Sequence, residues 1–367
     1  MIFLDNSSSS FFKPKSVVNA VKNTIEYLPF NASRGSHSGA LRAERLLYSA
    51  RKNIANAFGG MSDRVIFTGG CTEAVNLAIF GSAIEGGHVI ATVFEHNAVL
   101  RPLYRLNKAG IISLSFVSSL SGAKDAIQDN TYMLCVNHVS NVTGAEADLG
   151  AFGNLARERK LIYLVDAAQS AGYRSINMKA NGIDCLALAG HKGLHGIAGA
   201  GALLLSDRTK LTPFKYGGTG SAGSSPEQPD DVPDGLEAGT LATPNIAALN
   251  VGLNWSVLNM QKNAGYLKML SAKIIDGLEK IGGVSVYSHA NDFGIVAFNF
   301  GNLLSSDAGE IYNEQYDIAV RAGFHCAPLV HEHYGTKTGM VRVSLGVETR
   351  DWEVDAFLDA TREMAEV

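Results

Sequence analysis

The chain has 367 residues, of which 46% are hydrophobic and 18% are charged, and its formal net charge is −4. This length and composition allow a large buried core and suggest two domains, which excludes a disordered chain. The negative charge argues against a nucleic acid held by bulk electrostatics, and no apolar run is long enough to cross a bilayer. We therefore expect a globular protein with neither a nucleic-acid nor a membrane partner.

Cysteine usage indicates a reducing compartment. The four cysteines lie far apart and lack CxxC spacing: Cys71, Cys135, Cys185 and Cys326. This pattern favours free thiols in a cytoplasmic protein over a disulfide framework or a zinc site. The N-terminal sequence MIFLDNSSSS does not resemble a signal peptide. His331 and His333 form an HxH pair, but no third ligand is indicated, so we expect no metal site.

Helical and strand patterns alternate along the first two thirds of the chain. Apolar residues recur at helical spacing over residues 17–28 and 43–58. Short apolar runs follow, most of them separated by helical patterns, at residues 64–68, 88–93, 132–136, 161–165, 185–189 and 201–205. This alternation predicts βαβ units and a mostly parallel sheet that is buried on both faces.

The pattern changes after about Pro244. A long helical stretch over residues 246–278 leads into fewer strands and a final helix. We predict a large α/β domain over residues 15–250 and a smaller α+β domain built from residues 1–14 and 251–367. The segment 217–235 is rich in Gly, Ser, Pro and Asp, and its length inside a compact protein favours a functional loop over a linker.

Two polar residues follow neighbouring predicted strands. Asp166 ends the run LIYLVD, and Lys192 lies in the sequence GHK after the run DCLALA. Ligands of open α/β sheets bind at the carboxyl ends of the strands. A lysine that condenses with an aldehyde, opposite an acid that keeps a pyridine nitrogen protonated, is what pyridoxal phosphate (PLP) requires. We interpret the pair as a PLP site, because a solvated lysine and a loop-capping aspartate would not explain this pairing.

Three further segments follow predicted strands and extend this interpretation. FTGGCTEA (67–74) begins a helix, where backbone amides and the Thr72 hydroxyl would hold a phosphate. Alone, this segment predicts only an ordinary helix cap. His96, in FEHNAVLRPL, is suited to stacking on the cofactor ring, and Asn141, in HVSNVTG, to pointing into the same cleft. Their alternative interpretations are a structural histidine and a turn asparagine.

Six motifs, in chain order, resemble the class V aminotransferase superfamily of fold-type I PLP enzymes: TGGCTEA, EHNAVLRPL, SNVTG, VDAAQ, GHK and LEAGT. The resemblance extends from LDNSSSS near the N-terminus to VRVSL (341–345). It is greatest to cysteine desulfurases and selenocysteine lyases, because RAGFHCAPL (321–329) resembles the group II segment that carries a nucleophilic cysteine. It implies a large domain with a mostly parallel, seven-stranded-type sheet flanked by helices and a smaller α+β domain.

The resemblance assigns the cofactor-ring contacts residue by residue. It implies that Lys192 is the Schiff-base lysine and that Asp166 binds the pyridine nitrogen. Gln169 matches the residue that binds the phenolic oxygen of the cofactor. His96 matches the ring-stacking histidine and counts as both a catalytic and a cofactor-binding residue.

The resemblance also assigns the phosphate contacts. Thr72 and His191 match phosphate-side residues, with the amide of Cys71 close by. Thr240, in LEAGT, matches a threonine that reaches the phosphate of the other subunit, which implies a homodimer with shared sites. Ala189 departs from the pattern, because a serine or threonine is common at this position and one phosphate hydroxyl is therefore missing.

Asn141 and Arg342 match groups near the substrate carboxylate, and Cys326 matches the persulfide-forming nucleophile. A thiolate requires positive surroundings, which the neighbours Arg321 and His325 are placed to supply, although strand alternation could point them elsewhere. The competing interpretation of Cys326 is an inert buried thiol.

The resemblance implies a PLP-dependent cysteine desulfurase that takes sulfur from L-cysteine and leaves L-alanine, with a protein as a possible sulfur acceptor. The alternatives are a selenocysteine lyase, another class V aminotransferase or β-eliminating lyase, and a non-catalytic binding protein of the same fold. Sulfur and selenium substrates would use the same cysteine and the same carboxylate contacts.

Overall fold

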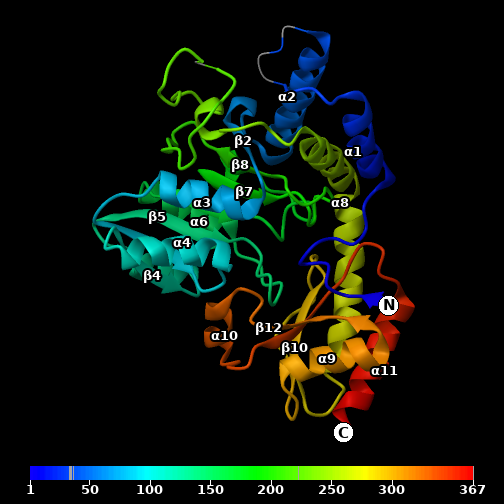
Figure 1. Ribbon diagram of the computed structural model, residues 1–367. Coiled ribbons are helices and arrows are strands. Elements are labelled where there is room, and N and C mark those ends of the chain that lie inside the picture. Colours follow the sequence, from blue (N-terminus) through cyan, green and yellow to red (C-terminus); the bar gives the residue numbers. More distant parts are fainter. Residues whose placement is uncertain (33–34, 36, 222, 367) are drawn as a thin grey trace.

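The computed structural model describes residues 1–366 except 33–34, 36 and 222. A large α/β part and a smaller part with its own sheet are joined by one long helix, α8 (Thr243–Leu278), which runs along both (Figure 1). The predicted fold class, a mostly parallel sheet flanked by helices with a smaller α+β unit, is confirmed.

The large part is built on a seven-stranded sheet. Its strands, in spatial order, are β2 (Val65–Thr68), β8 (Gly201–Leu205), β7 (Cys185–Ala189), β6 (Ile162–Asp166), β5 (Thr131–Asn137), β3 (Gly87–Thr92) and β4 (Ile112–Val117). The five strands from β7 to β4 are parallel, and β8 runs antiparallel to both of its neighbours. Only β4 was absent from the predicted strands. It pairs with β3 alone, and its partly exposed residues give no continuous apolar run.

Helices cover both faces of this sheet, which is why the strands read as unbroken apolar runs. One face packs against the following elements: α2 (Ser38–Phe58), α5 (Leu120–Asp125), α6 (Leu149–Glu158), α7 (Met178–Asn181) and the first half of α8. The other face packs against α3 (Cys71–Gly81) and α4 (Asn97–Lys108). α1 (Lys15–Tyr27) lies along α8.

The smaller part has a four-stranded antiparallel sheet with its own core. The strands are β12 (Arg321–Gly323), β13 (Met340–Ser344), β10 (Ile295–Phe300) and β9 (Val284–Val286), and they pack against the second half of α8, α9 (Ser305–Tyr316) and α11 (Asp351–Ala365). The chain start joins this part, since β1 (Ile2–Phe3) pairs with β11 (Ile318–Ala319). The proposed domain boundary at residues 250 and 251 falls inside α8. No helix in the described ranges is long and apolar enough to span a membrane.

The loops that follow β6 and β7 pack backbone against backbone. Gly172, at a φ of +96°, lies so close to the second loop that a Cβ would come 2.1 Å from the carbonyl oxygen of Gly193. These loops carry the residues that follow Asp166 and flank Lys192. The two glycines therefore set the spacing of the segments that hold the predicted PLP residues.

We expect Gly172→Ala to destabilise the protein by at least about 2 kcal/mol, because the methyl group overlaps Gly193 and a positive φ disfavours L-residues. Urea unfolding followed by circular dichroism measures the change. Gly265→Ala is the control, since Gly265 is exposed in α8 and its Cβ would meet nothing within 4 Å. The control should be as stable as the wild type or more so. Equal stability of Gly172→Ala and the wild type would contradict this account.

Candidate active site

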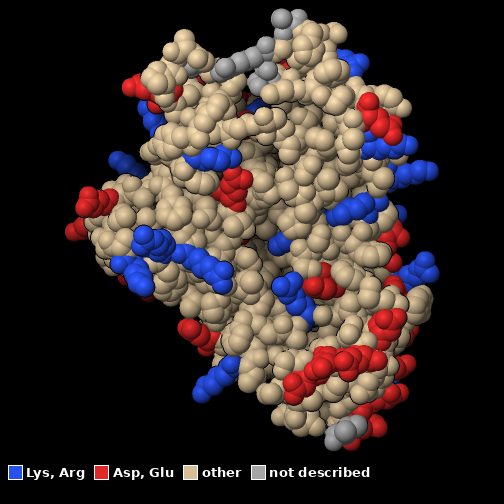
Figure 2. Space-filling view, in the orientation of Figure 1, with Lys and Arg blue, Asp and Glu red and all other residues tan. Residues whose placement is uncertain are grey.

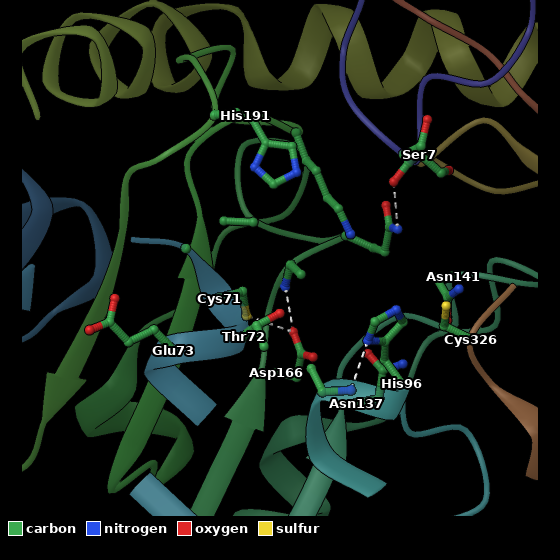
Figure 3. Close-up of a pocket in the computed structure, with 18 of the residues that line it drawn as sticks. Ser7, Cys71, Thr72, Glu73, His96, Asn137, Asn141, Asp166, His191 and Cys326 are labelled. Carbon is green, nitrogen blue, oxygen red and sulfur yellow. Dashed lines mark hydrogen bonds between the residues drawn. The ribbon is translucent and has the colours of Figure 1, made fainter. Parts of the chain in front are cut away.

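One cavity of about 810 Å³ opens at the carboxyl ends of β6 and β7 and reaches the small sheet. It brings together ten of the eleven predicted site residues: Cys71, Thr72, His96, Asn141, Asp166, Gln169, His191, Lys192, Cys326 and Arg342. Figure 3 shows Asp166 with Cys71 and Thr72 on one side and Asn141 with Cys326 on the other. The eleventh, Thr240, is exposed and does not line this cavity.

Asp166 is the last residue of β6 and is only 4% exposed. Its Oδ1 atom accepts hydrogen bonds from the backbone amide of Ala168 at 2.9 Å and from the Cys71 thiol at 3.3 Å. Burial raises the pKa of Cys71 well above its ordinary value, and the Asp166 charge adds to this, so the thiol keeps the proton that it donates. Neither donor uses Oδ2, and this oxygen remains for a ligand.

Lys192 lies just past β7, and its amine is surrounded by protein although the residue is partly exposed to the cavity. Burial lowers the pKa of Lys192, and the Asp166 charge opposes this shift. Within the described part of the chain the amine has no hydrogen-bond or ion-pair partner. A buried amine with a lowered pKa and no partner is suited to condensing with an aldehyde.

The N-terminus of α3 provides backbone donors for an anion. No side chain caps this helix, and no described residue accepts from the amides of Cys71 and Thr72. Gly70, which precedes them, lines the cavity, and a Cβ there would meet nothing within 4 Å. The open backbone, the free amides and the helix dipole fit a phosphate group.

His191 lines the side of the cavity where the sequence predicts phosphate contacts, and its imidazole carries no charge near pH 7. Burial lowers the pKa of His191 to about 4, and the neighbouring Lys192 adds to this, so the imidazole is neutral near pH 7. The Lys13 amine donates to the carbonyl oxygen of His191 at 3.2 Å. Burial lowers the pKa of Lys13 to about 8. Ala189 also lines the cavity and offers no hydroxyl.

His96 begins α4 as its N-cap residue. Its Nδ1 atom accepts from the amide of Ala98 at 3.0 Å, which leaves the proton of the neutral ring on Nε2. Burial lowers the pKa of His96 to about 4, which keeps the ring uncharged. A neutral, oriented imidazole on the cavity wall fits the predicted stacking role.

The smaller part supplies the wall of the cavity where the sequence predicts substrate contacts. Arg342, in β13, is buried, and its Nη2 atom pairs with Oδ1 of Asp5 at 2.6 Å. Its Nη1 atom donates to the carbonyl oxygen of Asn141 at 2.8 Å, while its buried Nε has no partner in the described ranges. Burial lowers the pKa of Arg342, against the opposing effects of Asp5 and Cys326.

Cys326 lies on a strained turn. His325 and Cys326 have positive φ values of 49° and 56°, a conformation that L-residues seldom adopt. Two contacts across the cavity hold the turn. The amide of Asn97 donates to the carbonyl oxygen of Cys326 at 2.6 Å, and the side chain of Asn141 donates to that of His325 at 2.7 Å. Cys326 is exposed, so the part of the competing interpretation that made it a buried thiol is wrong.

Of the two residues expected to supply positive charge beside Cys326, only Arg321 is a cation that lines the cavity. His325 is buried against the carbonyl oxygen of Met340, and burial with the Arg342 charge lowers the pKa of His325 to about 2. It is neutral and supplies no positive charge, which corrects that expectation. Arg321 does line the cavity, and its charge lies 3.8 Å from Asp5.

Sequence reasoning missed two acids that organise the site. Asp5 pairs with Arg342 across 337 positions of sequence, and only the fold could reveal this contact. Glu95 is fully buried beneath the site, where Oε1 accepts from the Thr92 hydroxyl and the Asn137 amide, both at 2.6 Å. Its signal was its place beside His96 in the EHN motif.

The parallel sheet, the buried lysine opposite a buried acid, and the free amides of α3 define a class of protein, the PLP-dependent enzymes of fold type I. A family model for class V aminotransferases matches residues 2–357. The chain belongs to this family, whose members are PLP-dependent enzymes, and the resemblance inferred from the sequence motifs is confirmed.

Several relatives match along nearly their whole length. A probable cysteine desulfurase of Methanothermobacter thermautotrophicus is 30% identical over 99% of this chain and 94% of its own. A cysteine desulfurase of Salmonella agona is 28% identical over 98% of this chain and 92% of its own. The apo structure of a cysteine desulfurase from Thermococcus onnurineus has a TM-score of 0.92 and 29% identity, covering 100% of this chain and 94% of that one.

Glu95 should make the stability of the protein fall as pH rises. Burial raises the pKa of Glu95 to about 8 from an ordinary value of 4.5, and Asp166 adds to this against the hydrogen bond from Thr92. Between these values the folded chain holds a proton that the unfolded chain has lost, so each pH unit costs roughly 1 kcal/mol of unfolding free energy.

We therefore expect Glu95→Gln to gain stability relative to the wild type from pH 5.5 to pH 7.5, as measured by urea unfolding of the cofactor-free proteins. Glu314→Gln, at an exposed position, is the control, and its free energy of unfolding should differ from that of the wild type by the same amount at every pH. A pH-independent difference for Glu95→Gln would show that Glu95 is already ionised in the folded protein.

Proposed function

We propose that this protein is a cysteine desulfurase that removes sulfur from L-cysteine through a persulfide on Cys326 and releases L-alanine. The observation that carries the proposal is the exposed Cys326 thiol in the same cavity as the buried Lys192 amine and Asp166. The fold, the family and the named relatives support the same activity. The domain division at residues 250 and 251 belongs to this proposal, since the smaller part carries Cys326.

The residues proposed to hold PLP divide by the part of the cofactor that they contact. The amides at the start of α3, the Thr72 hydroxyl and His191 hold the phosphate, and His96 covers the ring. Asp166 keeps a proton on the ring nitrogen, and Gln169 binds the phenolic oxygen. When bound, PLP supplies an aldehyde that condenses with amines and a protonated ring that accepts an electron pair.

Lys192 has two proposed tasks. Its amine would anchor the cofactor through the aldehyde, and the free amine would serve as the base that takes the α-proton of the substrate. The lowered pKa of Lys192 leaves more of the amine neutral near pH 7, which is the form that a general base requires. Asp166 favours proton removal because its charge keeps the ring nitrogen protonated.

Cys326 attacks the sulfur of the substrate as a thiolate. A bond forms between the two sulfurs, and the carbon–sulfur bond of the substrate breaks, leaving its electron pair on carbon for protonation to alanine. Arg342 binds the substrate carboxylate, and the unpartnered Nε of Arg342 supports this role. The side-chain amide of Asn141 already donates to His325, so we propose that Asn141 acts by holding Arg342 and the Cys326 turn together.

A homodimer with shared sites is part of the proposal. Val18 and Ile25 of α1 are 56% and 59% exposed, and with Val21 and Ile197 they line an apolar groove that a second copy would cover. Thr240 is exposed outside its own cavity, as a residue that serves the partner's phosphate would be. The four unpaired cysteines support a cytoplasmic location.

We expect Cys326→Ala to lose at least about 99% of alanine formation from cysteine while the PLP absorbance is unchanged, because the nucleophile is lost and the cofactor contacts remain. Alanine and sulfide are measured with L-cysteine, L-selenocysteine and cysteine sulfinate in parallel. Lys192→Ala is the matched control and should lose the imine absorbance as well. Alanine formation from cysteine at the wild-type rate in Cys326→Ala would overturn the persulfide route.

Subunit complementation tests the shared site. Lys192→Ala and Thr240→Arg should each be inactive, because every site then lacks its own lysine or its partner's threonine. Co-expression should restore about one quarter of the wild-type activity, since half of a random mixture is heterodimer with one complete site of two. Full activity of Thr240→Arg alone, or no recovery on mixing, would rule out the shared arrangement.

A further inference from the structure

Cys326 lines two cavities at once. Besides the cofactor cavity, it lines a shallow groove of about 420 Å³ that runs over α3 and α4. Its lining includes Thr72, Asn76, His96, Arg101, Arg105 and Cys326. Not one of these described lining residues is acidic. The carbonyl oxygen of Cys326 accepts from the first amide of α4, so the nucleophile is fixed at the start of this groove.

Three cations lie along one exposed face of α4, at Arg101, Arg105 and Lys108. Their spacing of four and three residues places them in one row, roughly 10 Å long. None of them has an ion-pair or hydrogen-bond partner in the part of the chain that the structure describes. Figure 2 shows blue side chains gathered over α4. This row is a local positive patch on a chain whose net charge is −4.

We propose that the α4 groove is the docking surface for an acidic segment of a partner protein, which brings a thiol to the sulfur on Cys326. This inference rests on the proposed desulfurase function and assigns the route by which the sulfur leaves. The unpaired row of cations provides charge complementarity to the partner. Outside the groove lining, Tyr104 on α4 is 48% exposed and Phe324, two residues before Cys326, is 50% exposed, and they add apolar surface.

The transfer step is a thiol–persulfide exchange. The thiolate of the partner attacks the outer sulfur of the Cys326 persulfide and forms a new sulfur–sulfur bond. The bond between that sulfur and Sγ of Cys326 breaks, and Cys326 leaves as a thiolate. The partner becomes the persulfide, so atoms and electrons balance without an oxidant or a reductant. The Cys326 thiol is exposed, which the attack requires.

The length of the row favours a protein segment over a small molecule. A compact acidic thiol would contact one of the cations near Cys326, whereas an extended acidic chain reaches all three. Affinity should therefore depend on both Arg101 and Arg105 and should fall steeply with salt.

The test uses the holoenzyme and three 12-residue peptides, each with one central cysteine, whose flanking residues are acidic, neutral or basic. The Cys326 persulfide is formed with L-cysteine, and excess L-cysteine is removed. Transfer of the outer sulfur from Cys326 to each peptide is then followed by mass spectrometry. We expect the acidic peptide to react at least about tenfold faster than the neutral peptide at low salt. Binding of Cys→Ser versions of the peptides, followed by fluorescence anisotropy, is measured separately.

The double variant Arg101→Glu/Arg105→Glu should lose the preference for the acidic peptide, yet form alanine at the wild-type rate with dithiothreitol as the acceptor. Arg45→Glu reverses one charge at an exposed position on α2, away from the groove, and should keep the preference. Equal rates for the acidic and neutral peptides, or a preference that survives in the double variant, would overturn the proposal. Glutathione reacting as fast as the acidic peptide would overturn the assignment to a protein segment.

Failure of the proposed function gives a different result. An enzyme that forms neither alanine nor a persulfide from cysteine is not a desulfurase, and the transfer step is then wrong. The anisotropy measurement does not depend on turnover, so it still decides whether the groove binds an acidic segment.

Discussion

The site depends on one constraint, the burial of an amine that has no hydrogen-bonding partner among the residues that the structure describes. Lys192 is held in this state because β6 and β7 are adjacent parallel strands, with Asp166 opposite Ala187, so the acid and the lysine emerge at the same edge. Desolvation favours the neutral amine and the Asp166 charge favours the protonated one, and desolvation is the larger effect. The close packing of Gly172 on Gly193 keeps the two loops at this spacing.

The opposite wall of the cavity is supplied by the smaller part of the protein, which has its own hydrophobic core. α8 connects the large sheet to the small one, and the small sheet positions Arg342 and the turn at Cys326 on the opposite wall of the cavity. Asn141 spans the junction, because its carbonyl oxygen binds Arg342 and its side chain binds the Cys326 turn. The turn at Cys326, which belongs to the smaller part, is thus held by contacts from the large part, and Cys326 also lines the groove over α4.

Most of the fold could be predicted because buried parallel strands read as apolar runs between helices. The edge strand β4 could not, since its outer residues are partly exposed and interrupt the run. Ten of the predicted site residues converge on one cavity, and the carboxyl-end rule accounts for those that follow strands of the large sheet. Asp5 escaped prediction because its contact with Arg342 is set by packing across the fold and leaves no local pattern, whereas Glu95 escaped although it stands beside His96 in the EHN motif.

The sequence by itself determined the cofactor, the family and the two-part architecture, since these follow from motifs whose residues are close together along the chain. The tertiary structure decided how those residues act. Burial made His325 neutral where its sequence position suggested a cation. The fold also brought Asp5 next to Arg342 as an ion-pair partner. The fold also placed Cys326 beside the start of α4, whose cations were not predicted from the sequence to have a function. Desolvation and charge pairing depend on distances across the fold, and spacing along the chain does not contain them.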